Sequence, residues 1–282
     1  MIAITGASGH LGKATLDYLV TQTNPDALVA IVRDPAKVAD LTAKGVQVRQ
    51  ADYADSQSLL EGLAGVDKLL LISSSALGAE RVSQHANVIQ AAKQAGVAHL
   101  FYTSAPNPSP KALFTPAIDH FETEKLIKES GLTYTIFRNN LYLDILPMVI
   151  GNATQSGQLF YPAGEGKVSF ALRADMAEGI ANALSSNGHE NKIYDIGAST
   201  AWSFRDIAAA LSQSGKAVAY VDMPIPAYAA ELQKHLPSEA VSVYVGMAEG
   251  LQQNAFNQPD PTLENLLQRQ PVSLEAYLKN AM

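Results

Sequence analysis

The sequence of 282 residues contains no cysteine, which excludes disulfide bonds, thiolate nucleophiles and zinc sites built on sulfur. Its six histidines are scattered and never form an H-x-x-x-H pair, so we expect no metal site. Basic residues are also few, with 20 lysines and arginines against 27 acidic residues and a formal net charge of -7. Without a basic cluster, nucleic-acid binding is not expected.

Long hydrophobic runs are absent as well. The most apolar stretch, residues 141–150, is interrupted by Asp144 and Pro147, so no membrane span is expected. The chain enters a glycine motif at its first residues, which leaves no room for a signal peptide. We therefore expect a cytoplasmic protein whose partner is a small molecule, and a homodimer is compatible with the sequence.

The first half of the chain alternates between short apolar runs typical of strands and longer stretches with the hydrophobic periodicity of helices. Short apolar runs rich in Val, Ile, Leu or aromatic residues occur at 2–5, 28–32, 46–49, 68–72, 99–103 and 134–138. Helix-like stretches lie between them at 11–19, 36–44, 56–64, 82–95 and 118–129, and four of these end at Gly45, Gly65, Gly96 and Gly131. Apolar strands alternating with helices predict an α/β protein with a Rossmann-type, doubly wound parallel sheet.

The pattern loosens after Asn140, and this change predicts the domain organisation. We expect a nucleotide-binding domain at 1–140, to which residues 175–197 return with a helix from Asp175 and a strand at 192–196. Residues 141–174 and 198–282 are expected to form a smaller C-terminal α/β lobe that binds substrate. Its later part, 203–282, reads as helices with one strand near 217–221. Doubly wound folds bind ligands at the carboxyl edge of the sheet, so we expect the lobe there.

The stretch I-T-G-A-S-G-H-L-G at residues 4–12 ends the first predicted strand and opens a helix. Its glycines follow G-x-x-G-x-x-G, a spacing that permits a tight turn and a close approach of backbone to a pyrophosphate. Amides at the start of the helix supply hydrogen-bond donors and a positive dipole end. In a strand-helix repeat this motif predicts a dinucleotide site; a glycine-rich turn without a ligand is the alternative.

The end of the second predicted strand distinguishes NAD from NADP. An acidic residue there binds the ribose 2′-hydroxyl and favours NAD, whereas an arginine favours NADP. Asp34 precedes a proline at the first helical position, so a helix N-cap explains it. Arg33 has no such role, and its guanidinium suits a 2′-phosphate. We expect NADP(H); Lys37 is a weaker second candidate, and Arg33 as a solvated strand-end charge is the alternative.

Several segments in one order carry a resemblance to a known family. They read T-G-A-S-G-H-L-G, I-V-R-D-P-A-K, Q-A-D-Y-A-D (50–55), L-L-L-I-S-S-S (69–75), F-Y-T-S (101–104), E-T-E-K (122–125) and F-R-N-N-L-Y (137–142). This set resembles the NmrA-like atypical short-chain dehydrogenases over most of the chain. The glycine motif alone is shared far more widely; the whole set in this order is specific.

The resemblance implies NADP(H) as cofactor and assigns residues to it. On this resemblance, the pyrophosphate is cradled by the loop of Gly6, Ala7, Ser8, Gly9, His10, Leu11 and Gly12, and the 2′-phosphate is bound by Arg33. Asp52 and Tyr53 lie by the adenine, and Ser73, Ser74 and Ser75 follow the ribose-phosphate side. Near the nicotinamide lie Thr103 and Ser104, with Lys125 on its ribose; Asn139, Asn140, Leu141, Tyr142, Leu143 and Asp144 lie beside nicotinamide and substrate, and Arg173 also contacts the cofactor. Lys125, Asn139 and Tyr142 are the predicted catalytic residues.

Structural explanations compete with several of these assignments. The serine run is common turn and capping chemistry, and Asp52 suits a turn cap. Lys125 suits a solvated helix charge paired with Glu122 or Glu129. Tyr142 suits a packed aromatic with a wet hydroxyl. His120 reads as a capping or surface histidine, and we assign it no catalytic role.

Phe121 stands four residues before Lys125, at a spacing where many nicotinamide-dependent reductases carry a proton-donating tyrosine. Reduction of a ketone forms a basic alkoxide and needs that donor. Reduction of a quinone forms a delocalised phenolate, and a cationic dye needs no proton. We therefore expect direct hydride transfer from NADPH to a quinone-like acceptor, with neither flavin nor metal. The alternatives are an NADP(H)-binding redox sensor without turnover and a carbonyl reductase with Tyr142 as its acid.

Overall fold

The computed structural model describes residues 1–213 and 215–281. Seven parallel strands form the central sheet in the order β3-β2-β1-β4-β5-β6-β9. Their bounds are β1 (Ile2–Thr5), β2 (Leu28–Val32), β3 (Gln47–Gln50), β4 (Lys68–Leu71), β5 (His99–Ser104), β6 (Thr133–Asn139) and β9 (Lys192–Ile196). The strand order reverses between β1 and β4, which creates the crevice where such sheets bind ligands. The predicted fold class is confirmed.

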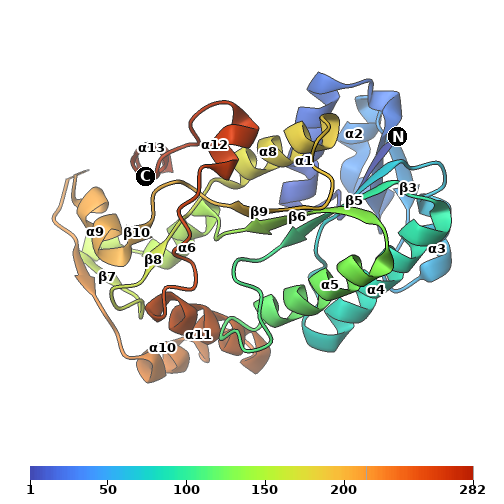
Figure 1. The fold of residues 1–282 in the computed structure, drawn as a ribbon. Coiled ribbons are helices and arrows are strands. Elements are labelled where there is room, and N and C mark those ends of the chain that lie inside the picture. Colours follow the sequence, from blue (N-terminus) through green and yellow to red (C-terminus); the bar gives the residue numbers. More distant parts are fainter. Residues whose placement is uncertain (214, 282) are drawn as a thin grey trace.

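Helices cover both faces of this sheet (Figure 1). One face carries α1 (His10–Gln22), α2 (Ala39–Ala43), α8 (Arg173–Ser185) and α12 (Thr262–Leu267), and the other carries α3 (Ser56–Gly62), α4 (Gly78–Ala95) and α5 (Pro116–Ser130). Neighbouring residues of β1 show why both faces are covered: Ile4 packs in the core under α1 and α8, and Ala3 packs in the core under α3 and α4. Successive strand side chains point to opposite faces, so both must be apolar here.

The remaining segments form a second body, seen on the left of Figure 1. It comprises η3 (Leu143–Ile145), α6 (Leu146–Ile150), α7 (Ala153–Ser156), β7 (Gln158–Phe160), β8 (Lys167–Val168), β10 (Trp202–Ser203), α9 (Phe204–Ser212), β11 (Ala219–Val221), α10 (Ile225–Leu232), α11 (Ser238–Gln252) and α13 (Leu274–Ala281). Strand β7 pairs in parallel with β11, and β8 pairs antiparallel with β10. Its core includes Tyr161 stacked on Phe204, with ring centroids 4.3 Å apart.

This lobe is joined to the carboxyl ends of β6 and β9. The backbone amide of Asn140, directly after β6, donates to the Ile196 carbonyl (2.8 Å), and the Asn140 side chain donates to the Phe256 carbonyl (3.0 Å). Gly197 lies so close to Ser169 that a Cβ there would be 2.7 Å from the Ser169 carbonyl oxygen. The lobe therefore sits beside the edge where the sheet's ligand crevice opens.

The structure departs from the sequence predictions in three places. The stretch expected as one helix at 36–44 is a 3-10 turn, η2 (Pro35–Val38), followed by the short α2, because Val38 leaves helical geometry with φ -131°. The short strands β7, β8 and β10 were not predicted. Finally, α12 lies within the segment assigned to the lobe, yet its Leu263 and Leu267 pack in the same core as α1 and α8.

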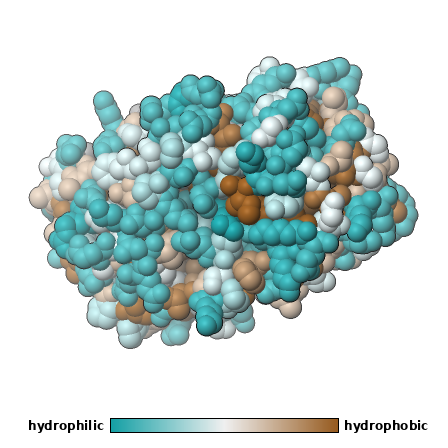
Figure 2. Space-filling model, in the orientation of Figure 1, coloured by the Kyte–Doolittle hydropathy of each residue, from teal (hydrophilic) through white to brown (hydrophobic). Residues whose placement is uncertain are grey.

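The visible surface in Figure 2 is mostly hydrophilic, with small separate apolar areas. The large apolar side chains that are exposed belong to different elements: Leu77, Leu113, Met148, Phe160 and Ile193. Single exposed apolar residues are normal for a protein surface. Among the described residues, no helix is both long enough and apolar enough to cross a bilayer.

Candidate functional site

The glycine loop between β1 and α1 is shaped by close backbone contacts. Gly6 has φ +62°, a left-handed conformation that favours glycine. At Gly12 an added Cβ would lie 2.6 Å from the Gly6 carbonyl oxygen and 2.9 Å from the Cα of Ala7. Only glycine permits this contact, and the contact folds the loop over the start of the helix. The loop is thereby held at the positive end of α1.

The first turn of α1 leaves backbone donors available. Its N-cap is Gly9, and no described side chain caps the helix there. Ser8, Gly9 and His10 are exposed, although the Gly9 amide donates to the Gly6 carbonyl (2.9 Å), whereas Ala7 and Leu11 are buried and anchor the loop. Exposed amides at a helix N-terminus form a ready-made anion site. This is what the cradle of a pyrophosphate requires.

A cleft of about 430 Å³ opens beside this loop, at the carboxyl ends of β1, β2, β3 and β4. Nine of the predicted cofactor residues line it: Gly6, Ser8, Gly9, Arg33, Asp52, Tyr53, Ser73, Ser74 and Ser75. They come from four separate segments of the chain. The structure therefore brings these four segments together at one cleft, and their role in cofactor binding stays a prediction.

A smaller hollow of about 260 Å³ shares three residues with this cleft, namely Arg33, Ala51 and Asp52. Arg33 is exposed and is the basic residue that lines both spaces. The acidic groups beside it have structural partners: one oxygen of Asp52 accepts from the Ala54 amide (2.9 Å), as expected for a turn cap. A guanidinium in this position is suited to a phosphate.

The neighbouring Asp34 does what the sequence predicts of an N-cap. Its carboxylate accepts a hydrogen bond from the Ala36 amide at 3.1 Å, at the start of η2. The cap accounts for Asp34 without a ribose contact. Tyr53, by contrast, uses its hydroxyl internally: the hydroxyl donates to the Ile72 carbonyl (2.7 Å) and lies 2.6 Å from the Thr5 hydroxyl. Burial raises the pKa of the Tyr53 phenol, which keeps it protonated.

Thr103 and Ser104, expected near the nicotinamide, are buried at the end of β5 and support the site from behind. The Thr103 hydroxyl accepts from the Ser73 amide at 3.0 Å. The Ser104 hydroxyl donates to Glu124 of α5 at 2.8 Å. Both hydroxyls thus bond to protein groups, and they fix α5 and the loop of Ser73, Ser74 and Ser75, here called the serine loop, to the sheet.

Glu124 is the centre of a buried ion-pair group. Arg138 of β6 approaches it with two nitrogens, Nε to Oε1 at 2.9 Å and Nη2 to Oε2 at 2.8 Å. Burial of the Glu124 carboxyl opposes its charge, but the hydrogen bonds from Arg138, Ser104 and Lys128 prevail and lower its pKa. The group joins α5 to the two strands that end beside the predicted nicotinamide site.

We expect Glu124→Gln to lower the free energy of unfolding at pH 7 by about 3 kcal/mol, since it leaves the Arg138 guanidinium without its counter-charge. The folded-state pKa of Glu124 lies below the ordinary value of 4.5, so its stabilising effect is present above that pH and is lost as pH falls through the folded pKa. Urea unfolding at pH 7 and pH 3.5 measures both. The exposed Glu129→Gln on the same helix is the control, and equal stability of the two variants would contradict the prediction.

Asn139, the last residue of β6, is 7% exposed, and neither of its amide atoms finds a hydrogen-bond partner among the described residues. Asn139 does not line the cleft described above. A buried amide without partners is costly, so the side chain is available to a group that reaches the end of β6. Tyr142 lies nearby: burial raises the pKa of its phenol, and Asn139 offsets part of that rise. Two of the three predicted catalytic side chains, Asn139 and Tyr142, therefore lie together.

Arg173 and Asp144 support Tyr142. The guanidinium of Arg173 stands 4.7 Å from the centre of the Tyr142 ring. Asp144 pairs with Arg173 (3.6 Å) and accepts a hydrogen bond from its backbone amide (2.8 Å) at the start of α8. The remaining predicted residues of this stretch contribute differently, because Leu143 packs in the lobe core while Leu141 is half-buried.

Lys125 and Phe121 lie on α5, where Lys125 is exposed and Phe121 is half-buried. The predicted role of Lys125 stays a prediction, since Lys125 does not line the cleft described above. His120 is not the capping or surface histidine that the sequence indicates. It lies inside α5 rather than at its start, is 6% exposed, and pairs with the Tyr102 hydroxyl at 2.6 Å. Packing of α5 against β5 buries it.

Two polar residues of the cleft escape sequence reasoning: Glu80 and Gln84 line it from α4. The predicted helix begins at residue 82, whereas α4 begins at Gly78. The additional turn contains Glu80, whereas Gln84 lies within the predicted helix but was not assigned to the site. Gly78 itself, with φ +62°, breaks the apolar periodicity that the prediction relied on.

The residues present fit a dinucleotide. Two phosphates can bind at the glycine loop, whose close packing requires Gly12, and at the amides of α1. The guanidinium of Arg33 suits a 2′-phosphate, and the unpartnered amide of Asn139 suits a polar ring substituent. Among the described residues, no group of three His, Asp or Glu side chains is arranged to hold a metal ion. Fold and site together define a Rossmann-type dinucleotide-binding protein.

Within that class, the chain belongs to the NmrA-like family, whose model matches residues 1–278. The resemblance found in the sequence is thereby confirmed. Quinone oxidoreductase 2 of Escherichia coli is 43% identical over 254 residues, covering 89% of this chain and 84% of the relative. The crystal structure of that NADPH-dependent enzyme in complex with NADPH superposes with a TM-score of 0.95 and 38% identity, covering 100% of this chain and 99% of that one. Triphenylmethane reductase of Citrobacter sp., complexed with NADP(H), superposes with a TM-score of 0.94 and 31% identity over the full length of both chains.

Proposed function

We propose that this protein is an NADPH-dependent oxidoreductase that transfers a hydride directly to a quinone-like acceptor, without flavin and without a tyrosine acid. The observation that carries the proposal is the single cleft in which the glycine loop, the serine loop and Arg33 meet. The relative from Escherichia coli, named a quinone oxidoreductase, supports the choice of acceptor.

The chemistry of α5 supports this acceptor class. Phe121 occupies the position where a tyrosine would protonate an alkoxide, and a phenyl ring donates no proton. A quinone that accepts hydride becomes a delocalised phenolate, which solvent protonates. NADPH plus a proton and a quinone then gives NADP+ and a hydroquinone. An acceptor of this kind needs positioning more than acid catalysis.

The chain's own residues have separate roles in this proposal. Asn139 and Tyr142 bind and orient the polar groups that meet at the end of β6, and the Asn139 amide donates to an oxygen that gains negative charge. The raised pKa of Tyr142 keeps its hydroxyl a donor at neutral pH. Lys125 holds the nicotinamide ribose, and the lobe from 141 onward excludes water above the acceptor. NADPH, when bound, supplies the hydride.

The test is NADPH oxidation by protein freed of flavin, followed at 340 nm with benzoquinones, naphthoquinones and triarylmethane dyes. We expect turnover with at least one of these acceptors, and no stimulation by added flavin. Phe121→Tyr should not be required, because no tyrosine acid takes part. Tight binding of NADP+ and NADPH with no turnover would instead favour a redox sensor, and activity found only in Phe121→Tyr would refute the acid-free mechanism.

We also propose a cytoplasmic location and retain the homodimer as a prediction. Gel filtration with light scattering tests the dimer. The division at residue 140 into a nucleotide-binding domain and a substrate-binding lobe is likewise our proposal. Its support is the connection between the lobe and the ends of β6 and β9 at Asn140 and Ser169.

A further inference from the structure

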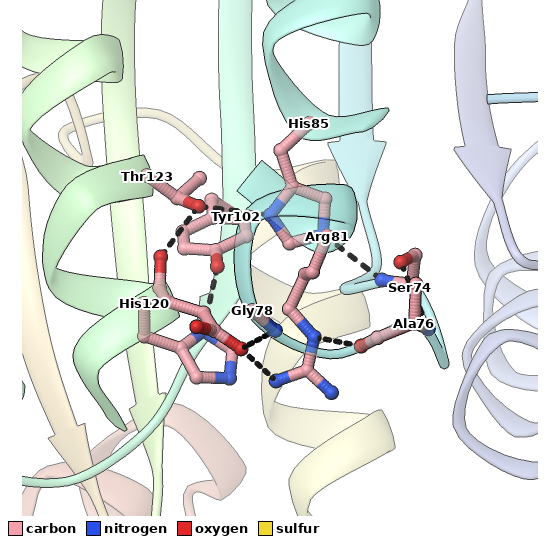
Figure 3. Close-up of polar contacts among 9 residues, drawn as sticks. Ser74, Ala76, Gly78, Arg81, His85, Tyr102, His120 and Thr123 are labelled. Carbon is pink, nitrogen blue, oxygen red and sulfur yellow. Dashed lines mark hydrogen bonds and ion pairs between the residues drawn. The ribbon is translucent and has the colours of Figure 1, made fainter. Parts of the chain in front are cut away.

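The loop that follows β4 lines the cleft, and buried side chains of α4 hold its backbone (Figure 3). The Ser74 amide donates to Nε2 of His85 at 2.9 Å. Two residues later, Nε of Arg81 donates to the Ala76 carbonyl at 2.5 Å. His85 is 0% exposed and Arg81 is 8% exposed. These side chains therefore act on the loop from inside the protein, behind the surface that faces the cleft.

A third contact comes from α5. Asp119, which is 7% exposed, accepts a hydrogen bond from the Gly78 amide at 2.9 Å and pairs with Nη1 of Arg81 at 3.5 Å. The close-up in Figure 3 shows Arg81 reaching between the loop and α5. Since α5 also carries Phe121 and Lys125, one polar network joins the serine loop to the helix expected beside the nicotinamide.

The hydrogen bonds also fix the state of His85. The Thr123 hydroxyl donates its proton to the Asp119 carbonyl (2.8 Å), so it accepts from Nδ1 of His85 at 2.9 Å. Nε2 must then keep its lone pair for the Ser74 amide, and the ring is neutral. Burial, with a smaller effect from Arg81, lowers the pKa of His85 to about 3, in agreement with this tautomer.

Neighbouring rings enclose the imidazole. Tyr102 of β5 meets His85 edge to face, with centroids 5.5 Å apart, and its own hydroxyl is taken by His120 at 2.6 Å. Tyr102 is fully buried. Such enclosure restricts the imidazole to one orientation, so that its Nε2 presents a fixed acceptor to the loop.

We infer that His85 is a positioning residue for the dinucleotide: by fixing the Ser74 amide it holds the loop of Ser73, Ser74 and Ser75 in the conformation that binds the cofactor. This inference rests on the proposed function, because NADPH is the ligand. A loop fixed before binding loses less conformational freedom when the ligand arrives, and this raises affinity. The role of His85 is thus to support binding without touching the cofactor.

Two amide variants of His85 distinguish the contribution of Nε2 from that of Nδ1. Glutamine places an amide oxygen near the position of Nε2, where it accepts from Ser74, whereas asparagine reaches only the position of Nδ1. We expect the dissociation constant for NADPH, measured by quenching of protein fluorescence, to rise about tenfold in His85→Asn and to stay within about twofold in His85→Gln. Hydrogen exchange at the Ser74 amide should be fast in His85→Asn and slow in His85→Gln.

A matched control and a milder variant complete the experiment. His99 is also a buried histidine, at the opposite end of β5, where it pairs with Thr135 at 2.8 Å. His99→Asn should lower the melting temperature and leave the NADPH dissociation constant unchanged. If His85→Asn does not fold, Thr123→Val removes the partner of Nδ1, together with the hydrogen bond to the Asp119 carbonyl inside α5, and should raise the dissociation constant about threefold.

The outcomes separate this inference from the proposed function. Unchanged NADPH affinity in folded His85→Asn and in Thr123→Val would overturn the positioning role alone. The expected pattern of affinities in a protein that reduces no quinone would support the positioning role and refute the proposed reaction. A wild-type protein that bound no NADPH would overturn both.

Discussion

Arg33→Ala is expected to raise the dissociation constant for NADPH about 30-fold and to leave that for NADH within about twofold. The guanidinium is exposed on the shared wall of the cleft and the smaller hollow, where a 2′-phosphate can accept two parallel hydrogen bonds from it. Charge-assisted hydrogen bonds contribute about 2 kcal/mol, which corresponds to this factor. Titration of both nucleotides by fluorescence measures the effect.

Lys37→Ala is the matched control for Arg33. Lys37 is also basic and exposed, four positions further along in η2, and it lines neither space. We expect its removal to change NADPH affinity by less than about twofold, while Arg33→Lys should recover part of the affinity because a point charge lacks the guanidinium fork. Equal NADPH affinity of wild type and Arg33→Ala would refute the assignment of the 2′-phosphate to Arg33.

Gly12→Ala is expected to weaken NADPH binding about 100-fold. The new Cβ would stand 2.6 Å from the Gly6 carbonyl oxygen, a backbone atom that cannot rotate away as a side chain does. Relief requires the glycine loop to move off α1, which separates the amides that would bind the pyrophosphate. Overpacking of this kind costs about 3 kcal/mol, and isothermal titration with NADPH measures its effect on binding.

Gly62→Ala controls for the change of residue type. Gly62 lies in α3, where an added Cβ would make ordinary contact with Ala51 at 3.5 Å. Alanine also favours the helix over glycine, so we expect unchanged binding and equal or higher stability. NADPH affinity retained in Gly12→Ala would show that the loop adapts without loss, and the close packing would then have no role in binding.

Local patterns in the sequence predict much of the fold because they reflect short-range physics. Apolar runs such as 28–32 and 99–103 predict strands that are buried on both faces, and β2 and β5 are. Gly96 and Gly131 end helices in the left-handed conformation that glycine adopts without strain. The glycine loop and Asp34 as N-cap follow from the same local rules.

The support of the site depends on contacts that no local pattern contains. Glu124 meets Arg138 across 14 positions, and His85 meets Thr123 across 38 positions. A buried histidine and a surface histidine look alike in sequence, so His120 is misread without the packing of α5 on β5. The additional turn of α4 is hidden for a similar reason, since Gly78 interrupts the pattern while tertiary contacts stabilise the helix from there.

The sequence by itself determined the strand-helix order, the glycine loop and the family, and it predicts the cofactor preference at Arg33. Each rests on residues that act within a few positions of one another. Only the tertiary structure decided that α12 packs with α8, that Asn139 is buried without a partner among the described residues, and that His85 holds the serine loop. These features depend on which distant elements meet, and burial there sets the protonation and hydrogen bonding of each group.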